Sequence, residues 1–579
     1  MHKAAGPGDD MHEHEQLQRL MDAYAASGIS RREVMKRAAA LGISVPAIAA
    51  LLAKAAPAAA APAGGTATGR ARTQEVTPGG TLREGYDLDF SPMDPIATAW
   101  YDPAFYALYE HAITIDPEGN YVPQLAESWE VSEDGMALTL KIRSGLKFHS
   151  GAPLDAAAIK GVYDTIKDPA SASPLASLFN PVESIDAPDA TTVVLNFSAP
   201  YADIFNVIST GYWAICNVAF RAENSDTYGS AVIDGSGPFT FGEWVTGSHV
   251  TVNKWAEYPG SIVPYFENKG PAYLDGIRWE AILEQSQRAI RIENNEIDSV
   301  HAPAFQDVSR LEGNGDLNVV RLKEWSGYIM GLNFKRTQFD FQDVKMRQAV
   351  SHALNRQAIV DALLFGEGEP LYGPITTADR YYSSEVEQFN QYDVEKAKGL
   401  VAELGWVANS DGVLEKNGTA LEFNLVVQAE SLNQQFGQVI QDQLAQIGMK
   451  VNVVSLDRGT FFGDLGSEEG VDSHLFYWAW PVPADIIQIF ISTGTMGGPN
   501  WSYASVPEVD AAITAWQTAA NEDELREAAR MMQVSVAEHL PVVSLVNRNS
   551  VWVNRNTVHG YLPHQWNLYP YYNDVWLEQ

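Results

Sequence analysis

Two short segments of the chain concentrate aromatic side chains next to a carboxylate. They are TAWYDPAFY, with Trp100, Tyr101 and Asp102, and FYWAWPVPAD, with Tyr477, Trp478, Trp480 and Asp485. Aromatic rings supply a large, rigid contact area, and their faces suit sugars, flat rings or cations. Tyr212 and Trp213 form a third candidate pair. The pattern predicts a site that binds an organic solute; the alternative is that each ring fills a hydrophobic core.

Catalytic and metal-binding patterns are absent from the sequence. The chain has no GxSxG turn, no HExxH pair and no GxxxxGK[ST] phosphate loop. The stretch DGSGP at 234–238 lacks the nucleophile spacing and is interpreted as a crossing between lobes. The 12 histidines are scattered, and His352 lies on a predicted helix where packing is an ordinary role. We therefore expect no catalytic residue, no cofactor and no free-metal site, although a chelated metal held by aromatic rings and Arg stays open.

Composition limits the partners of the chain. Its formal net charge is −34, and a surface of that sign repels nucleic acid phosphates, so no nucleic acid partner is expected. The single cysteine, Cys216, rules out an intramolecular disulfide and is interpreted as a small buried apolar residue. A chain of 579 residues exceeds what one core organises, so two or three lobes are expected.

Residues 1–63 have the features of an export signal. SRREVMK at 30–36 resembles the twin-arginine signal, and a mostly alanine apolar run over 38–53 follows it. The run is too short and too weakly apolar for a membrane span, and the APAAAAPAGG that follows offers small-residue cleavage sites. No cysteine stands there to carry a lipid. We interpret the segment as a removed leader, which predicts a soluble periplasmic protein; the alternative is an amphipathic helix.

The rest of the chain alternates strand-like and helix-like runs, which is typical of α/β lobes. GMALTLKIRSGLKF predicts a strand that places Leu138, Leu140 and Ile142 on one side. A helix is predicted over 343–366, ended by Gly366, and QFGQVIQDQLAQIGMKVNVV predicts a helix, a glycine turn and a strand.

Several phrases together resemble one family. They are PQLAESWEVSEDGMALTLKIRSGLKFHSGAPLDAAAIK, GSGPFTFGEWVTGSHVTVNKWAEY, MRQAVSHALNRQAIVDALLFGEGEPLYGP, YDVEKAKGLVAELGW and FYWAWPVPADIIQIF. In this order they resemble the family 5 extracellular solute-binding proteins, the receptors of peptide, opine and nickel ABC importers. The likeness runs from about Pro78 to the C-terminus and is specific for the family but not for the ligand. Within it, Trp129, Leu140 and Phe148 are expected to pack a small β-rich lobe, with Asp134-Gly135 turning a hairpin.

The resemblance implies a periplasmic-binding-protein-like clam shell of two lobes, type II, cluster C, with an extra β-rich domain. The expected boundaries are 77–112, 233–325 and 546–579 for lobe I, 113–232 for the extra domain and 326–545 for lobe II. Ligand would be enclosed between the lobes by hinge closure.

The resemblance also points to ligand contacts. It places Trp480 after a lobe II strand, where relatives put an aromatic ring on the ligand. Dipeptide-binding relatives carry an Asp nearby for the peptide ammonium, where this chain has Pro481. They carry an Arg near residue 434 for the carboxylate, where this chain has Gln434 between Asn433 and Gln435. Losing both charges argues against the usual free-dipeptide mode. Asp485 is a substitute for the ammonium contact, although PADIIQ also suits a helix cap.

The predicted function is that of a receptor, not an enzyme. It would capture a peptide-like or other small organic solute as a monomer and deliver it to the membrane permease of an ABC importer. The alternatives are an exported peptide or glycoside hydrolase and a ligand sensor, or chaperone-like protein, that serves a membrane kinase. Oligopeptides, opines, oligosaccharides and chelated metals all remain candidate ligands.

Overall fold

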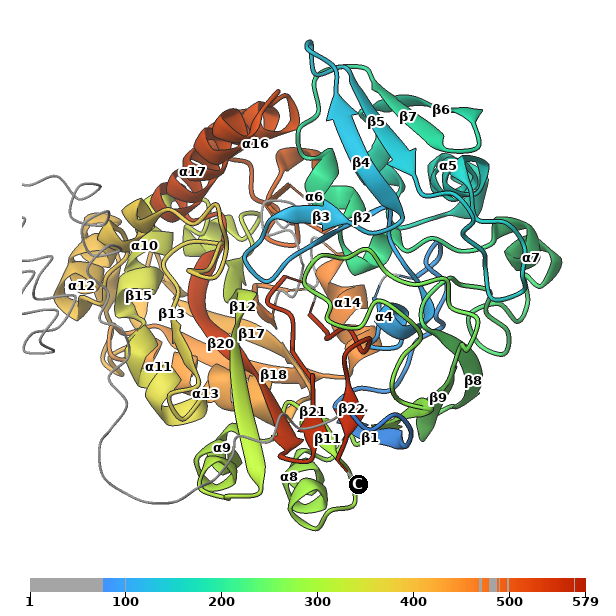
Figure 1. Cartoon of the computed structure of the whole chain (residues 1–579). Coiled ribbons are helices and arrows are strands. Elements are labelled where there is room, and N and C mark those ends of the chain that lie inside the picture. The colour runs from blue at the N-terminus through green and yellow to red at the C-terminus, as the bar shows by residue number, and fades with distance from the viewer. Residues whose placement is uncertain are drawn as a thin grey trace, which may run out of the picture. The chain divides into compact units, whose positions relative to one another are not determined.

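One long mixed sheet organises the molecule (Figure 1). A computed structural model of the chain describes residues 76–98, 100–467, 471–477, 487, 488, 490–496, 499–566 and 568–578, apart from the side chain of Ser326. These residues fall in a single contact unit, Val76–Gln579. Within them the sheet has 11 strands. In spatial order they are β18 (Lys450–Leu456), β17 (Glu422–Gln428), β19 (Ser473–Tyr477), β12 (Leu317–Leu332), β20 (Val543–Arg555), β11 (Ser299–His301), β1 (Thr81–Tyr86), β10 (Gly276–Ala281), β9 (His249–Lys254) and β8 (Phe239–Val245), with β13 (Gly368–Pro370) on β20.

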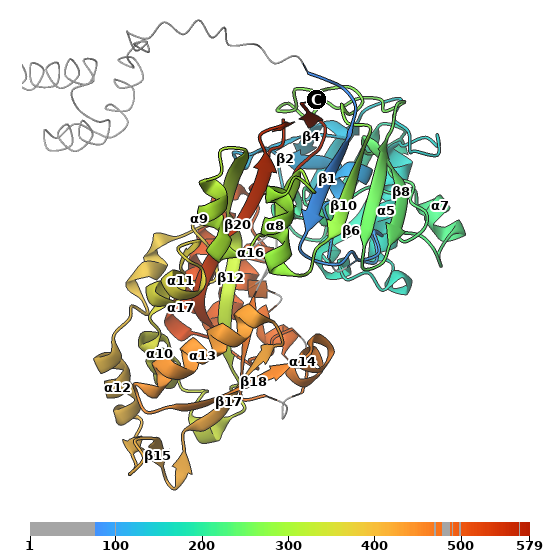
Figure 2. The same cartoon turned by 90° about the horizontal axis from the view of Figure 1, so that it is seen from below.

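The two long strands β12 and β20 join the halves of this sheet. They run antiparallel side by side through the molecule (Figure 2). The first part of β12 pairs only with β20, which also pairs with β11, and the last part of β12 pairs with β19 as well. Their register shifts between Lys323 and Gly327 and again between Tyr328 and Ile329. The ladder is therefore irregular at the crossing from the β11–β8 half to the β19–β18 half.

Each half of the sheet is an α/β layer with its own buried cluster. In one half β1 pairs in parallel with β10 and β11, and α8 (Gln285–Glu293) and α9 (Phe305–Glu312) contribute to a cluster that includes Ile292 and Leu311. In the other half β17 pairs in parallel with β18 and β19, under helices α10 (Val344–Ala353), α11 (Arg356–Leu363), α12 (Val394–Glu403) and α13 (Ser431–Ala445). The predicted helix–glycine–strand unit is confirmed, since α13 leads through Gly448 at φ +83° into β18.

A separate four-stranded antiparallel sheet lies within the predicted extra domain. Its order is β4 (Ala126–Val131), β5 (Ala137–Ile142), β7 (Thr192–Phe197) and β6 (Val182–Asp189), and α5 (Ala156–Lys167) packs on it. Leu138, Leu140 and Ile142 are buried, as their alternation predicts, and Asp134-Gly135 turns the β4–β5 hairpin. Trp129 packs against this core, as predicted, but it is half-buried and also lines a pocket.

The predicted helix over 343–366 is wrong in one respect, because it is two helices. It breaks at Leu354-Asn355, between α10 and α11. The Asn355 side chain accepts a hydrogen bond from the Ala358 N–H and so caps α11, while the Gln443 side chain accepts one from the Asn355 N–H. These polar contacts outweigh the continuous apolar periodicity of the sequence.

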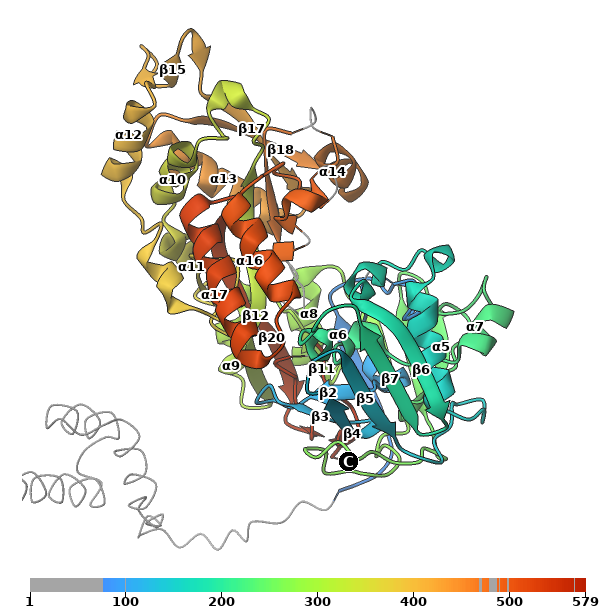
Figure 3. The same cartoon turned by 90° about the horizontal axis from the view of Figure 1, so that it is seen from above.

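The remaining elements complete the two ends of the unit. They are α4 (Phe105–Leu108), β2 (Ile113–Ile115), β3 (Tyr121–Pro123), α6 (Ile204–Ile208), α7 (Val218–Glu223), β14 (Val407–Ala408), β15 (Leu414–Lys416), β16 (Thr419–Ala420), α14 (Arg458–Leu465), α16 (Pro507–Gln517), α17 (Glu522–His539), β21 (Val558–His559) and β22 (Trp576–Leu577). The connection between α16 and α17 meets the start of α6, where the Ala202 N–H donates to the Ala519 carbonyl over 3.1 Å (Figure 3). No helix in the described part of the chain is both long and apolar enough to cross a membrane.

Candidate functional site

An arginine–carboxylate pair occupies the irregular stretch of β12 and β20. Arg548 on β20 donates from Nε to Oε1 of Glu324 on β12 over 3.2 Å, and its guanidinium lies 4.1 Å from the ring centre of Tyr477. The side chains of Arg548 and Glu324 are 29% and 13% exposed. Burial alone would lower the pKa of Arg548, but Glu324, Tyr328 and Asp87 raise it overall. The guanidinium therefore stays charged at a position that solvent still reaches.

A second carboxylate faces the same arginine from the other half of the sheet. Asp87 Oδ1 lies 2.8 Å from His301 Nδ1, and His301 Nε2 lies 3.0 Å from Ser550 Oγ on β20. Burial opposes ionisation of Asp87, but His301, Arg288 and Arg548 together lower its pKa to about 2. Burial raises the pKa of Glu324, and Arg548 and His301 counteract that rise. The cluster thus combines one cation with two carboxylates of different proton affinity.

Backbone irregularity explains why these side chains meet. The β12–β20 ladder has no pairs between Lys323 and Gly327, so the carbonyl of Glu324 lacks a strand partner. Thr376 Oγ1 donates to this carbonyl over 2.8 Å, and the Asn547 amide donates to it as well. Side chains therefore satisfy the broken ladder, as a buried carbonyl requires.

Aromatic rings flank the charged cluster on both sides. On one side Tyr477 lies 4.9 Å from Tyr328, which stacks at 4.1 Å on Phe436. On the other side His301 lies 4.3 Å from Trp552 and 6.2 Å from Tyr569. Such surroundings suit a planar or aliphatic group attached to a charged one.

The first predicted aromatic segment joins this arrangement through Tyr569. Tyr101 lies 5.8 Å from Tyr569 and 6.5 Å from Trp100, ring centre to ring centre. Tyr101 is fully buried, whereas Trp100 is half-buried. Asp102 is fully buried and accepts hydrogen bonds from the Tyr86 hydroxyl at 3.1 Å and the Ser91 N–H at 3.0 Å. The contact of these residues with a ligand stays a prediction.

The other predicted site residues lie elsewhere or outside the described part of the chain. Tyr212 is buried 4.6 Å from Tyr101, and Trp213 is buried and stacks at 4.3 Å on Phe179. Gln434, near the start of α13, donates to Ser455 Oγ on β18 over 3.0 Å. Trp478, Trp480, Pro481 and Asp485 fall outside the described residues, and Tyr477 precedes them directly in the sequence. Their roles also stay predictions.

The sequence analysis missed the charged cluster. Asp87, His301, Glu324 and Arg548 are separated by more than 450 residues of chain from first to last, and only the strand pairing brings them together. One signal was available. The apolar run VVSLV of β20 is interrupted by NRNS at 547–550 before VWV resumes, and polar residues in the middle of a central strand need a reason.

Asp102 predicts a pH dependence of stability. Burial raises its pKa to about 7, against the hydrogen bonds from Ser91 and Tyr86, compared with about 3.9 in an unfolded chain. The stabilising contribution of the protonated form is complete below about pH 4 and is lost as pH rises through about 7. For this group the free energy of unfolding should be lower at about pH 8 than at about pH 5 by on the order of 3 kcal/mol. The melting temperature should therefore also be lower at about pH 8.

Scanning calorimetry of the wild type and Asp102→Asn at both pH values checks this. The asparagine variant should lose part of the pH slope and keep the rest, because Glu84 and Glu110 also have pKa values raised to about 7 by burial. An unchanged slope in Asp102→Asn would exclude Asp102 as a source of the effect.

Comparison with known proteins shows which proteins this chain is similar to. A family model described as bacterial extracellular solute-binding proteins, family 5, middle, matches residues 120–497. The glutathione-binding protein GsiB of Escherichia coli (strain K12) is 26% identical over 402 residues, which are 69% of this chain and 72% of GsiB. Among solved structures, NikZ from Campylobacter jejuni in complex with Ni(L-His) has a TM-score of 0.73 at 20% identity, covering 85% of this chain and 97% of NikZ.

The oligopeptide-binding protein AppA from Bacillus subtilis, in complex with a nonapeptide, is also similar. Its TM-score is 0.73 at 22% identity, covering 87% of this chain and all of AppA, 100%. At these identities the two structures show the fold, and they confirm the predicted α/β architecture of a two-lobe periplasmic-binding-protein type.

Proposed function

Because this chain belongs to family 5 of the bacterial extracellular solute-binding proteins, we propose that it captures a peptide-like solute at Arg548 and passes it to the permease of an ABC importer. The observation that carries this proposal is the Arg548 guanidinium, half-buried between Glu324 and the Tyr477 ring where the β12–β20 ladder is irregular. A guanidinium binds a carboxylate through two parallel hydrogen bonds, and partial desolvation strengthens that contact. The ligand therefore carries a carboxylate next to an apolar or planar portion.

The paired strands β12 and β20 supply the hinge of this receptor. A ladder that lacks regular pairs between Lys323 and Gly327 resists bending less than a continuous one. Tyr328 and Tyr477 stand on one side of the irregularity, and Asp87 and His301 come from the opposite half of the sheet. A solute that contacts both sets favours the closed arrangement by its differential affinity, which is how a ligand shifts such an equilibrium.

Among candidate ligands, peptides that carry both a carboxylate and an ammonium group rank first. The Asp and Arg of dipeptide-binding relatives are replaced by Pro481 and by the Asn433–Gln435 segment. Arg548 with Glu324 and Asp87 offers a different set of charges, which suits a ligand that carries both an acid and an ammonium group. GsiB, by its name, binds glutathione, so glutathione is the first peptide to test. Opines, oligosaccharides and chelated metals are the comparison ligands.

We propose the remaining properties from the sequence. Residues 1–63 act as a twin-arginine-type leader, and the mature chain works in the periplasm as a monomer without a cofactor. A net charge of −34 supports the expectation that nucleic acid is not a partner. The ATPase of the importer supplies the energy, so this chain needs no nucleotide site.

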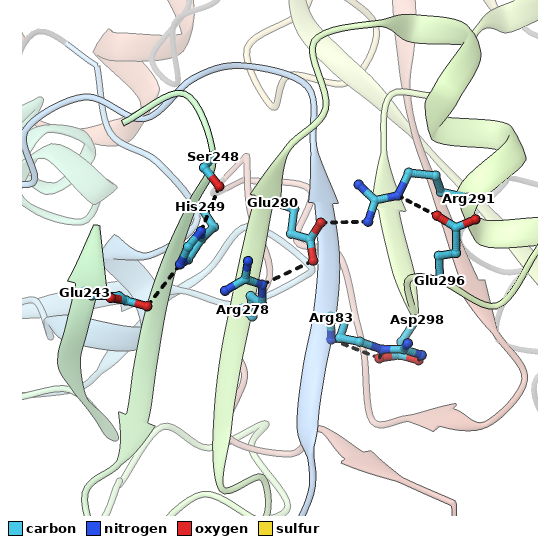
Figure 4. Close-up of polar contacts among 9 residues, drawn as sticks. All are labelled: Arg83, Glu243, Ser248, His249, Arg278, Glu280, Arg291, Glu296 and Asp298. Carbon is cyan, nitrogen blue, oxygen red and sulfur yellow. Dashed lines mark hydrogen bonds and ion pairs between the residues drawn. The ribbon is translucent and has the colours of Figure 1, made fainter. Parts of the chain in front are cut away.

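The alternative of an exported hydrolase has one local arrangement of side chains in its favour. Figure 4 shows Ser248, His249 and Glu243 in a row at the β8–β9 end of the sheet, with Ser248 Oγ 2.9 Å from His249 Nδ1 and His249 Nε2 3.1 Å from Glu243. In a hydrolytic triad the serine bonds Nε2 and the acid bonds Nδ1. The nitrogens are used in the opposite sense here, and neighbouring pairs such as Arg291–Glu280 and Arg83–Asp298 resemble a structural network. We therefore propose a receptor without catalytic activity.

Trp480, which follows β19 by three residues in the sequence, is a second residue to test. Trp480→Ala should weaken binding by more than about 1 kcal/mol while leaving the melting temperature of the empty protein nearly unchanged. Isothermal titration with glutathione and with the best ligand of each other class measures the effect. Trp244→Ala on β8, where the ring is half-buried far along the sheet from β20, is the matched control. Intact binding in Trp480→Ala would remove Trp480 from the site.

A further inference from the structure

A second pocket lies where the predicted extra domain meets the start of α17. Its volume is about 670 Å³, and it shares no lining residue with the cluster around Arg548. One wall comes from residues 118–205, including Tyr121, Trp129 and Phe205. The other comes from Arg380 and from residues 520–526. Figure 3 shows α16 and α17 near α6. The lining residues come from β4, α6, the start of α17 and the segments around them.

The pocket wall from the extra domain is a surface of stacked rings. Tyr121 stacks on Phe205 at 5.3 Å, and Trp129 lies 6.2 Å from Phe205. All three rings are half-buried, so each keeps part of its surface open. A β-sheet that is fully packed would bury such rings, and their partial exposure together in one pocket favours a ligand with a flat or apolar portion.

The opposite wall supplies a cation, Arg380. Among the described residues Arg380 forms no ion pair, and its one hydrogen bond from the side chain is a long one, 3.4 Å from Nη2 to Asn206 Oδ1. Its guanidinium lies 4.7 Å from the ring centre of Tyr121 and 5.5 Å from that of Trp566. Burial opposes its charge, but neighbouring Tyr121, Tyr381, Asp379 and Glu522 raise the pKa of Arg380 overall. The residue is thus a charged, half-buried donor group facing aromatic rings.

The carboxylates near Arg380 are committed to other partners. Glu522 pairs with Arg526 over 3.1 Å and accepts a hydrogen bond from the Tyr381 hydroxyl. Asp203 accepts hydrogen bonds from Asn206 Nδ2 at 2.8 Å and from Trp516 Nε1 at 3.0 Å. Asp379 accepts a hydrogen bond from the Tyr381 N–H over 2.7 Å. These acids act on Arg380 through their charge but form no ion pair with it among the described residues, so its N–H donors are available to a ligand carboxylate.

We propose that this pocket binds a carboxylate attached to an aromatic or similarly flat apolar group, with the carboxylate on Arg380 and the ring against Phe205 and Trp129. The guanidinium fork matches a carboxylate, and the rings supply faces for stacking. Because the two walls belong to different segments, an occupant stabilises the contact between the extra domain and α17. The carboxylate is either a separate small molecule or the far end of a long ligand held at Arg548.

The test uses the full chain with 3-phenylpropionate as the probe and 3-phenylpropanamide as its neutral match. Isothermal titration should give a dissociation constant in the millimolar range or below for the acid, and at least five-fold weaker binding for the amide. Arg380→Gln should remove this preference for the acid. The matched control is Arg530→Gln on α17, where Arg530 pairs with Glu527 and Glu385 outside the pocket. It should bind the acid as the wild type does.

Two further variants test whether a lost signal comes from misfolding and which site binds the probe. Trp129→Leu keeps the cation but removes one ring, so it should weaken the probe even if Arg380→Gln fails to fold. Two results would overturn the proposal directly: equal binding of the acid and the amide, or no binding of the acid up to about 10 mM. Loss of probe binding in Arg548→Met would also overturn it, because the probe would then be bound at the Arg548 site. Failure of the probe leaves solute binding at Arg548 untouched, so the two proposals fail separately.

If the pocket binds the probe, a long peptide that loses affinity in Arg380→Gln identifies the carboxylate as the far end of the main ligand. Unchanged affinity for all peptides identifies a separate small acid. In either case the Arg380 pocket is the receiving site.

Discussion

Arg548→Met is expected to abolish most solute binding and to lower the free energy of unfolding by about 2 kcal/mol. Removing the guanidinium leaves Glu324, which is 13% exposed, without its ion-pair partner and still in the field of Asp87. Truncating one member of a largely desolvated charge pair costs about 2 kcal/mol or more in binding, roughly thirty-fold in the dissociation constant. Titration calorimetry and urea unfolding measure the two effects.

A double variant separates the effect of Arg548 on stability from its effect on solute binding. Glu324→Gln added to Arg548→Met removes the uncompensated charge, so the double variant should recover at least half of the lost stability but none of the lost binding. Lys323→Met is the matched control on the same strand, because Lys323 is 49% exposed and pairs with Glu369 at the surface. Full binding in Arg548→Met would show that the guanidinium does not contact the solute.

Gly327→Ala is expected to destabilise the protein by about 3 kcal/mol. Gly327 pairs with Asn547 where β12 regains its register with β20. A Cβ at this position would lie 2.4 Å from the Val546 carbonyl oxygen and 3.1 Å from the Asn547 Cα. These obstacles are backbone atoms of the partner strand, so no side-chain rotation relieves them, and the two strands must separate.

A second glycine provides a control of opposite sign. Gly399 lies within α12, and a Cβ there would meet no atom within 4 Å. Gly399→Ala should therefore stabilise the protein by up to about 1 kcal/mol through helix propensity. Urea unfolding midpoints compare the two variants directly. Equal stability of Gly327→Ala and the wild type would mean that the strand crossing tolerates wider spacing than the geometry indicates.

Local patterns in the sequence predicted those parts of the fold that depend on near neighbours. The alternation of Leu138, Leu140 and Ile142 and the turn at Asp134-Gly135 are both present. The prediction of one helix over 343–366 failed because Asn355 caps α11 and its N–H donates to Gln443, 88 residues away. Periodicity carries no information about such a contact. The core role of Trp129 was predicted, but its part in a pocket was not, since its neighbour Phe205 comes from a distant helix.

The charged cluster could not be predicted in the same way. Asp87, His301, Glu324 and Arg548 come together only through pairing of β11, β12 and β20 and through the missing ladder pairs between Lys323 and Gly327. Sequence reasoning instead favoured aromatic density, which led to Tyr101 and Trp213. The structure buries both rings, and Trp213 stacks on Phe179. Aromatic residues serve cores and binding sites alike, so their density alone does not distinguish the two.

The most direct test of solute capture is a thermal-shift screen of refolded protein, wild type beside Arg548→Met. The panel contains glutathione, peptides of about two to six residues, opines, oligosaccharides and nickel chelates. A ligand that binds only the folded state adds about 2.7 kcal/mol at 100 times its dissociation constant, a shift of a few degrees. The account predicts such a shift for a carboxylate-bearing, peptide-like member in the wild type and none in Arg548→Met. No shift with any carboxylate-bearing solute, or the same shift in both proteins, would contradict it.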